Sequence, residues 1–154
     1  MPFKLSMPFD YAGASRINVG RTTTQTLTDA NWTKVVFSTE NTDNLSEYNN
    51  TTGVFTATNS GYYIIAARVM TSSYVWTAGN RYLIRCLVNG SSVVAGRYTY
   101  CQTAYTGYMD SQLTYIGYVA AGQEVQIDAF CDRGSNTATF ASQEYVKLAI
   151  HRLS

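Results

Sequence analysis

Short runs of alternating apolar and polar residues, separated by turn-forming clusters, recur along most of the chain. Such spacing is typical of a β-sandwich or β-barrel, and it disfavours βαβ units. No segment of useful length has the 3.6-residue period of an amphipathic helix. The pattern predicts strands at residues 16–19, 33–38, 53–56, 61–71, 81–88, 92–98, 113–120, 124–131 and 145–153.

Turn-forming residues separate these predicted strands. The stretches 49–53, 59–61, 89–90 and 121–122 supply asparagine or glycine, the residues that most readily adopt positive φ. The dipeptide Asn89-Gly90 is the sharpest of these signals, because it suits a type I′ turn between two β-rich runs. We therefore expect a hairpin at this point.

Length and composition agree with an all-β protein. The 154 residues are enough to bury one real core. They are 45% hydrophobic and only 14% charged, and they include thirteen tyrosines, a composition that fits half-buried pleated sheets. The prediction is one β domain over residues 14–154, preceded by a segment of different character over residues 1–13.

The segment 1–13 has its own alternating pattern and two prolines. The apolar members of this pattern are Phe3, Leu5, Met7, Phe9 and Tyr11. In an extended chain they share one face, so the segment could be an arm that adds to another chain's sheet edge or lies in a hydrophobic groove. A frayed or locally tucked terminus explains the same pattern.

Charge and hydropathy limit the expected partners and location. A formal net charge of +1, with eleven scattered Lys and Arg, gives no broad field for attracting phosphates, so neither nucleic acid nor an acidic membrane is an expected partner. The N-terminus lacks the continuous apolar core of a signal peptide, and no segment approaches a membrane-spanning length. We expect a protein made in the cytosol.

The three cysteines indicate neither a disulfide framework nor a zinc site. Cys86, Cys101 and Cys131 are odd in number and lack CxxC spacing. Cys86 and Cys131 lie in alternating strand patterns and are expected as small buried hydrophobic residues. Cys101, in a polar and tyrosine-rich setting, is not placed by the pattern. Free thiols are the prediction for all three.

Catalytic and metal-binding residues are sparse. His151 is the only histidine, and the predicted strand places it outward with Lys147. Asp128 and Asp132 are the one acidic pair of note, but residues four apart on a strand lie about 13 Å apart, too far for one ion or a retaining glycosidase. Asp132 is better explained as the cap of the turn that follows it. No enzyme, cofactor or metal is predicted.

The order of features over residues 14–154 resembles the C1q-like domain, in the form common among phage and bacterial surface proteins. The matching stretches are Ala14–Val19, Trp32–Phe37, Tyr48–Phe55, Gly61–Ile64, Leu87–Gly90, Val119–Val125 and a final aliphatic strand that ends at Leu153. The resemblance implies a ten-stranded C1q/TNF-like jelly roll that forms a homotrimer. Gln123 stands where the family usually has an acidic residue, and no collagen-like stalk is present, so calcium binding and collagen-driven assembly are not carried over.

A trimer also suits the aromatic content of the chain, which one small core cannot fully cover. Alternation separates the adjacent Tyr62 and Tyr63 onto opposite faces, and it separates Tyr115 from Ile116 and Tyr118. These five residues are the candidate trimer interface. The alternative is that the rings only fill the monomer core, where each hydroxyl needs a hydrogen-bond partner.

The stretch 96–110 is the most suggestive of binding. Its four tyrosines Tyr98, Tyr100, Tyr105 and Tyr108 would form a candidate ligand-contact loop, because tyrosine supplies rigid amphipathic area for protein or sugar recognition. Packing between subunits is the alternative use of the same rings.

Two functions follow as expectations. The first is a non-enzymatic structural protein of a phage virion, a capsid decoration or fibre knob attached to a capsid or tail protein by its N-terminal arm. The second is an adhesin module that binds a host receptor or glycan through the tyrosine-rich loop. The phage assignment rests on the resemblance.

Overall fold

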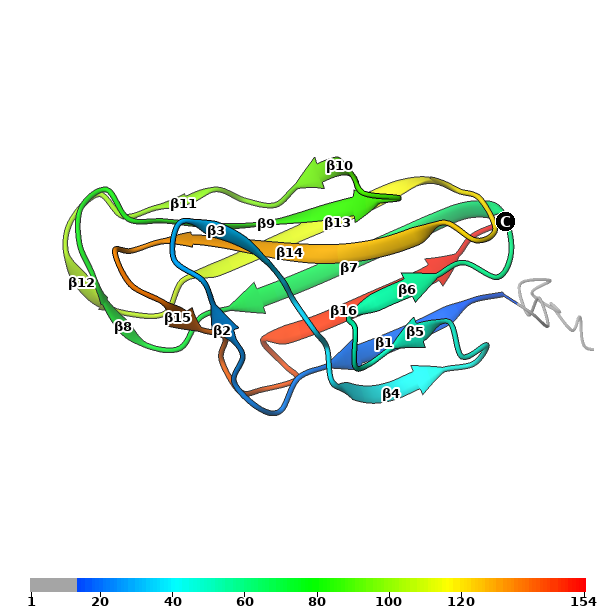
Figure 1. The fold of residues 1–154 in the computed structure, drawn as a ribbon, viewed down its shortest axis with the longest axis horizontal. Coiled ribbons are helices and arrows are strands. Elements are labelled where there is room, and N and C mark those ends of the chain that lie inside the picture. Colours follow the sequence, from blue (N-terminus) through cyan, green and yellow to red (C-terminus); the bar gives the residue numbers. More distant parts are fainter. Residues whose placement is uncertain (1–13) are drawn as a thin grey trace, which may run out of the picture.

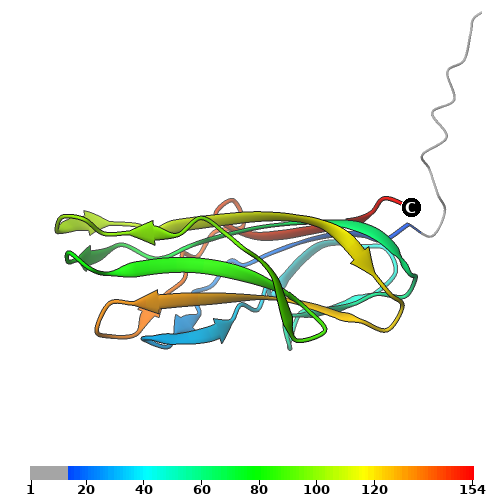
Figure 2. The same ribbon diagram turned by 90° about the horizontal axis from the view of Figure 1, so that it is seen from above.

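Two antiparallel sheets enclose one hydrophobic core in the computed structural model, which describes residues 14–154 (Figures 1 and 2). The five-stranded sheet has the order β13 (Asp110–Val119), β7 (Gly61–Met70), β16 (Val146–Arg152), β1 (Arg16–Gly20) and β4 (Thr39–Asp43). The six-stranded sheet has the order β10 (Ser91–Ala95), β9 (Arg81–Val88), β14 (Glu124–Asp132), β6 (Val54–Thr56) and β5 (Tyr48–Asn49), and β11 (Thr99–Tyr100) also pairs with β9.

Shorter strands complete the sandwich. β8 (Tyr74–Trp76) pairs with β12 (Tyr105–Gly107), and β2 (Thr26–Leu27) pairs with β15 (Thr137–Ala138). β3 (Asn31–Lys34) runs beside β14, flanked by the hydrogen bonds from Ala30 N to Cys131 O and from Val35 N to Ile127 O, both 2.8 Å. The β8–β12 pair lies at the opposite end of the molecule from the C-terminus (Figure 1).

The long strands form where alternation gives each one an apolar face. On β7 the inward residues include Tyr63, Ile65 and Val69, which are fully buried. On β16 Val146, Leu148 and Ile150 are buried in the same way, and the residues that alternate with them face outward. A strand with one apolar face is stable only when that face covers a core, so the two sheets pack face to face. The all-β jelly-roll prediction is confirmed.

Large aromatic side chains fill the core, and their polar atoms are bonded inside it. Trp76 Nε1 donates to Gly107 O at 2.8 Å. Tyr63 Oη donates to Asn59 O at 2.6 Å, and Tyr82 Oη donates to Val69 O at 3.2 Å. Because each buried group has an acceptor, these rings add apolar contact without the cost of an unpaired polar atom.

Two glycines are required by the backbone. In the predicted Asn89-Gly90 hairpin the two residues have φ of 49° and 79°, as a type I′ turn demands. Gly61 is needed for a different reason, because a Cβ atom there would lie 2.0 Å from the carbonyl oxygen of Ser154. The start of β7 can therefore pass directly beside the C-terminal segment.

The strand prediction was accurate for long strands and incomplete for short ones. The predicted strand 33–38 is correct in existence but wrong in its bounds: β3 spans Asn31–Lys34, and Val35 and Phe37 are buried just beyond its end. Seven short strands were not predicted, namely β2, β4, β5, β8, β11, β12 and β15. The described residues contain sixteen strand segments, more than the ten that the family resemblance implied.

Candidate interaction surfaces

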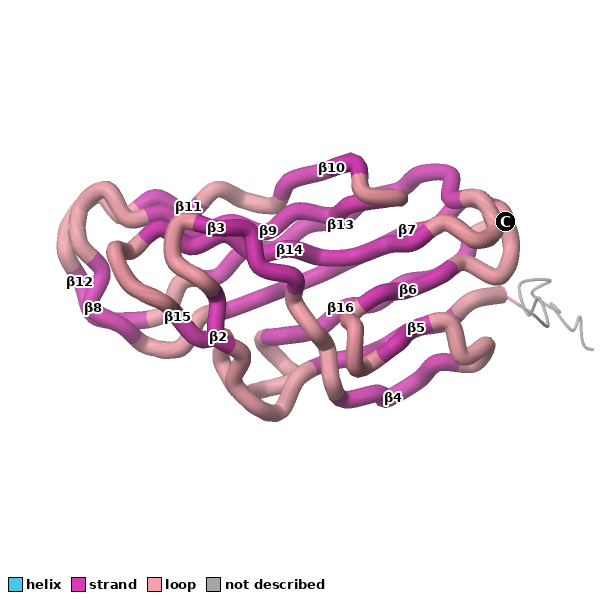
Figure 3. Tube along the Cα trace, in the orientation of Figure 1, coloured by secondary structure: helices cyan, strands magenta, loops and turns pink. Residues whose placement is uncertain are grey.

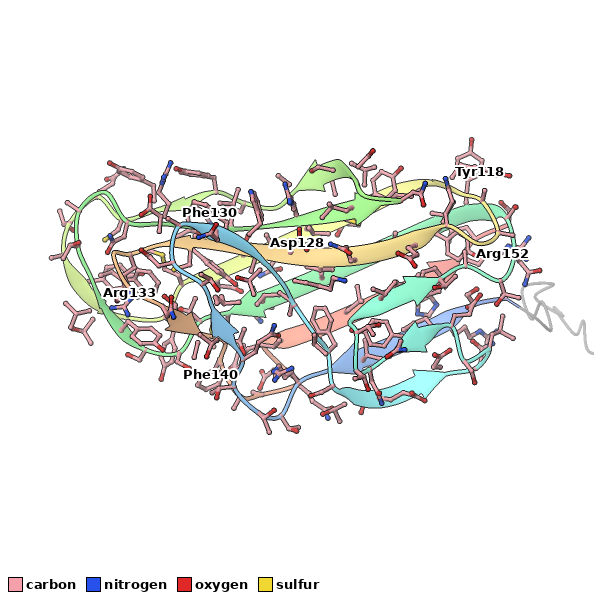
Figure 4. The ribbon with its side chains drawn as sticks, viewed as in Figure 1. Tyr118, Asp128, Phe130, Arg133, Phe140 and Arg152 are labelled. Carbon is pink, nitrogen blue, oxygen red and sulfur yellow. The ribbon has the colours of Figure 1, made fainter. Side chains whose placement is uncertain are left out.

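The outer face of the five-stranded sheet carries an uncovered apolar strip. Cross-strand register places Tyr118 opposite Tyr62, and it places Ile116 opposite Ile64. Tyr62, Ile116 and Tyr118 are 55%, 61% and 55% exposed. We define the apolar strip as Tyr62, Ile64, Ile116, Tyr118 and Leu153. The backbone N–H of Leu153 donates to Tyr62 O at 2.7 Å. Figure 4 shows Tyr118 near Arg152, at the end where the chain terminates.

The tyrosine rings of the strip are held in place by each other. The Tyr62 and Tyr118 rings meet edge to face, with centroids 5.8 Å apart. Such a pair adds about 1 kcal/mol beyond the area that it buries. The rings therefore form a fixed apolar surface although both are more than half exposed.

Away from the strip, the same sheet face becomes polar. Ala66 and Ala149 lie opposite each other on β7 and β16 in the next row, so the side chains there are small. Beyond them Arg68 forms an ion pair with Asp110, at 3.0 Å, and stacks over the Tyr145 ring at 4.9 Å from its centroid. The face thus changes from apolar to charged along its strands.

The predicted trimer-interface residues separate into two groups. Tyr62, Ile116 and Tyr118 lie together in the apolar strip. The placement of Tyr63 at an interface is wrong for this chain, whereas that of Tyr115 stays a prediction. Tyr63 is fully buried in the core, and Tyr115 is partly buried against the core. The phenol of Tyr115 occupies the space above Gly117, where a Cβ atom would lie 2.0 Å from the Tyr115 oxygen.

The outer face of the six-stranded sheet carries a second group of aromatic residues, each covered by an arginine. We call it the arginine–aromatic cluster. Its members are Trp32, Arg81, Arg85, Asp128, Phe130 and Asp132. Arg85 stacks 4.0 Å from the Trp32 centroid, and the Trp32 and Phe130 rings are 5.4 Å apart. Asp128 and Phe130 are labelled on β14 in Figure 4.

Ion pairs hold the arginines over these rings. Arg85 pairs with Asp128 at 3.0 Å, and Arg81 pairs with Asp132. Asp128 is 5% exposed and also accepts a hydrogen bond from Gln126 Nε2 at 2.9 Å. The sequence did not reveal this cluster directly, although two arginines and two aspartates at matching four-residue spacing were a usable signal.

The predicted role of Asp132 as a turn cap is wrong. Asp132 ends β14 and bonds Arg81. The turn is capped instead by Asp29, whose Oδ1 accepts from the backbone N–H of Arg133 at 2.8 Å and of Gly134 at 3.0 Å. Asp29, from a distant segment, therefore caps the turn that Asp132 was expected to cap.

The tyrosine-rich stretch 96–110 lies at the end opposite the C-terminus, where β8, β11 and β12 connect through loops (Figure 3). Tyr98, Tyr100, Tyr105 and Tyr108 are 50%, 53%, 40% and 51% exposed. Val75, on β8, is 62% exposed and was not among the predicted residues. The structure thus places all four tyrosines on an accessible surface, with one aliphatic side chain at the same end.

Two of these tyrosines, Tyr105 and Tyr108, are held by contacts within the chain. Tyr105 Oη donates to Tyr108 O at 3.2 Å. Tyr108 packs edge to face on Phe140, with centroids 5.3 Å apart, and Phe140 packs on Tyr145 at 5.7 Å. Phe140 is labelled in Figure 4. Rings held this way lose little conformational entropy when they meet a partner.

The described residues offer little for catalysis. His151 is exposed, as predicted, and lies opposite Ile64 and Arg16 on the sheet face. Burial raises the pKa of Cys86 to about 12 and also raises the pKa of Cys131, so neither thiol is prepared as a nucleophile. Cys101, which the pattern did not place, is 2% exposed.

Two further features concern metals and membranes. Within residues 14–154 no group of three or more His, Cys, Asp or Glu is placed to hold a metal ion. No helix long and apolar enough to cross a membrane occurs in that range. The predicted arm residues Phe3, Leu5, Met7, Phe9 and Tyr11 lie outside the described residues.

Comparison with solved structures identifies the fold class as a C1q/TNF-like jelly roll. The globular domain of zebrafish complement 1qA matches with a TM-score of 0.63 and 14% identity, covering 91% of this chain and 98% of that one. Murine APRIL matches with a TM-score of 0.62 and 11% identity over 91% and 99%. Eiger TNF from S. frugiperda matches with a TM-score of 0.63 and 8% identity over 92% of each chain.

Sequence comparisons add nothing to this fold assignment. No protein-family model matches the chain, and a search of curated proteins found no match. Identities of 8–14% show a shared fold alone.

Proposed function

We propose that this chain is a non-enzymatic, homotrimeric structural protein of a phage virion, a capsid decoration or fibre knob attached through residues 1–13. The trimer rests on one observation, the uncovered apolar strip on the five-stranded sheet. Three large side chains, Tyr62, Ile116 and Tyr118, are each more than half exposed on neighbouring positions of two paired strands. An exposed patch of this kind favours association with a protein surface.

A three-fold assembly places a specific demand on this surface. In a cyclic trimer each contact is head to tail, so the strip of one copy meets a different surface of the next copy. The small residues Ala66 and Ala149 beside the strip allow close approach at the centre of the sheet face. The C1q and TNF-type folds of the matching structures are consistent with such a module.

The virion assignment rests on the resemblance of residues 14–154 to phage-type C1q-like domains and on the alternating apolar pattern of residues 1–13. The described chain begins at the end of the sandwich that also holds the C-terminus (Figure 1). Ala14 lines a pocket with Leu153, a member of the apolar strip. An arm leading from this end could bind a capsid or tail protein and leave the tyrosine-rich end pointing away.

Two measurements test this proposal. Light scattering should give three times the chain mass, and a monomer at micromolar concentration would overturn the trimer. Electron microscopy of purified particles should locate the protein on the virion, and a variant lacking residues 1–13 should remain trimeric but lose attachment. Unchanged attachment of this variant would overturn the role of the arm.

A second function is supported by the tyrosine-rich end, where four tyrosines are 40–53% exposed. We propose as the alternative that this end binds a host receptor or glycan, since supported tyrosine rings are efficient recognition surfaces. A glycan array and a host-cell binding assay should then give signals that Tyr98→Ala and Tyr105→Ala reduce. Absence of any binding by the parent protein would overturn this function.

A further inference from the structure

A groove of about 520 Å³ runs beside the tyrosine-rich end, between residues 97–99 and the start of β13. Its lining combines a cation, a carboxylate, an amide, a hydroxyl, an aromatic ring and an apolar side chain: Arg97, Asp110, Gln112, Thr99, Tyr108 and Met109. Of these residues only Tyr108 belongs to the four exposed tyrosines, and none of them belongs to the apolar strip. The volume suits one or two sugar rings rather than a folded protein segment.

The two sides of the groove are tied together by hydrogen bonds. Arg97 N donates to Gln112 O at 3.1 Å, and Thr99 Oγ1 donates to Asp110 O at 3.0 Å. Ser111 Oγ donates to Arg97 O at 2.9 Å. The backbone positions of the lining side chains are therefore fixed before any ligand enters, which lowers the entropic cost of binding.

The charges in the groove are unequal. Asp110 is paired by Arg68 through Nε, at 3.1 Å, and through Nη2, at 3.0 Å, and it accepts a further bond from Gln112 Nε2 at 3.1 Å. The exposed Arg97 guanidinium has no ion-pair or hydrogen-bond partner within the described part of the chain. One positive charge is left over, so the groove favours a ligand that carries a carboxylate.

An aromatic platform stands beside these polar groups. Tyr108 is 51% exposed, and its ring packs edge to face on Phe140, with centroids 5.3 Å apart. Sugars present an apolar ring face and a rim of hydroxyl groups, so they pair well with a supported aromatic ring next to planar polar side chains. Both kinds of group converge in this groove.

We propose that the groove binds a carboxylate-bearing sugar of a surface glycan. Arg97 pairs in a bidentate manner with the sugar carboxylate, and Tyr108 stacks on the apolar face of the ring. Asp110 accepts from ring hydroxyls while Gln112 bonds a further oxygen. This site deepens the alternative function, receptor or glycan binding, and does not depend on attachment to a virion.

The test is calorimetric titration of the full chain with N-acetylneuraminic acid and with glucuronic acid, with galactose as the neutral probe. The acidic sugars should bind and galactose should bind more weakly. Arg97→Gln should weaken the acidic sugars by about tenfold or more, and Arg97→Lys, which keeps the charge but loses the planar fork, by less. Arg16→Gln removes an exposed cation on β1, away from the groove, and should change nothing.

Other results would overturn the proposal. Equal affinity of the parent and Arg97→Gln would do so, and so would failure of both acidic sugars to bind at millimolar concentration. A glycan array in which Tyr98→Ala loses binding but Arg97→Gln does not would preserve the adhesin function and remove this groove from it. Binding to a protein receptor alone would also exclude the groove as a sugar site.

Discussion

The arginine–aromatic cluster and the apolar strip, on the outer faces of the two sheets, differ in how their aromatic side chains are covered. On the six-stranded sheet, Trp32 and Phe130 lie under arginines that are held by aspartates. In the apolar strip, Tyr62 and Tyr118 pack edge to face on each other and stay more than half exposed. Both faces belong to the same sandwich, so sheet packing alone does not explain the difference.

The contrast indicates which face meets water and which meets protein. An arginine over a ring supplies a charged outer surface and shields the apolar one, with its own charge balanced by a carboxylate. The apolar strip has no such cover within the described residues. The arginine–aromatic cluster is therefore shielded within a single chain, whereas the apolar strip exposes apolar surface at a free-energy cost that association removes.

The largest expected effect is on assembly. Ile116, at the centre of the apolar strip, is 61% exposed in the single chain. Ile116→Glu introduces a charge there, so the fold should persist while the trimer dissociates. Light scattering at micromolar concentration should show the mass falling to that of one chain. Val75→Glu changes an equally exposed residue at the opposite end and should leave the mass unchanged. If both variants stay trimeric, the strip is not the interface.

The second effect is on the stability of the covered face. The Asp128 side chain is only 7% exposed, and Asp128→Ala leaves Arg85 without its ion-pair partner. We therefore expect a loss of about 2–3 kcal/mol in the free energy of unfolding. Asp132→Ala breaks a more exposed pair, with side chains 42% and 34% exposed, and should cost clearly less than Asp128→Ala. Urea denaturation measures both.

An equal loss in these two variants would contradict the claim that burial makes the Arg85 pair the stronger one. The unfolding curves need one fixed protein concentration, because the stability of an oligomer depends on it.

The sequence predicted the long strands because alternation along a strand directly reflects which face is buried. The run 81–88 and the observed β9 (Arg81–Val88) coincide for this reason. The short pair of β8 and β12 could not be predicted, since Tyr74–Trp76 pairs with Tyr105–Gly107, a segment far along the chain. Local patterns carry no record of such distant partners.

The surfaces were predictable to a smaller degree. Alternation separated Tyr62 from Tyr63, but the sequence alone did not say which of the two faces the core, and the structure buries Tyr63. The arginine–aromatic cluster depends on the register of β9 and β14, which places Arg85 opposite Asp128. Register is a property of paired strands, so the cluster becomes visible only when the strands are aligned.

The smallest expected effect separates the two faces by their dependence on concentration. Trp32→Ala removes a stacking partner of Arg85 and Phe130 within one chain, and it should lower the free energy of unfolding by about 1 kcal/mol at every protein concentration. Tyr62→Ala should instead act through assembly, so its loss should appear as a weaker trimer and vary with protein concentration. Thermal unfolding over a hundredfold range of concentration distinguishes the two patterns. A concentration-independent loss for Tyr62→Ala would mean that the strip stabilises the single chain and that the contrast between the faces has another cause.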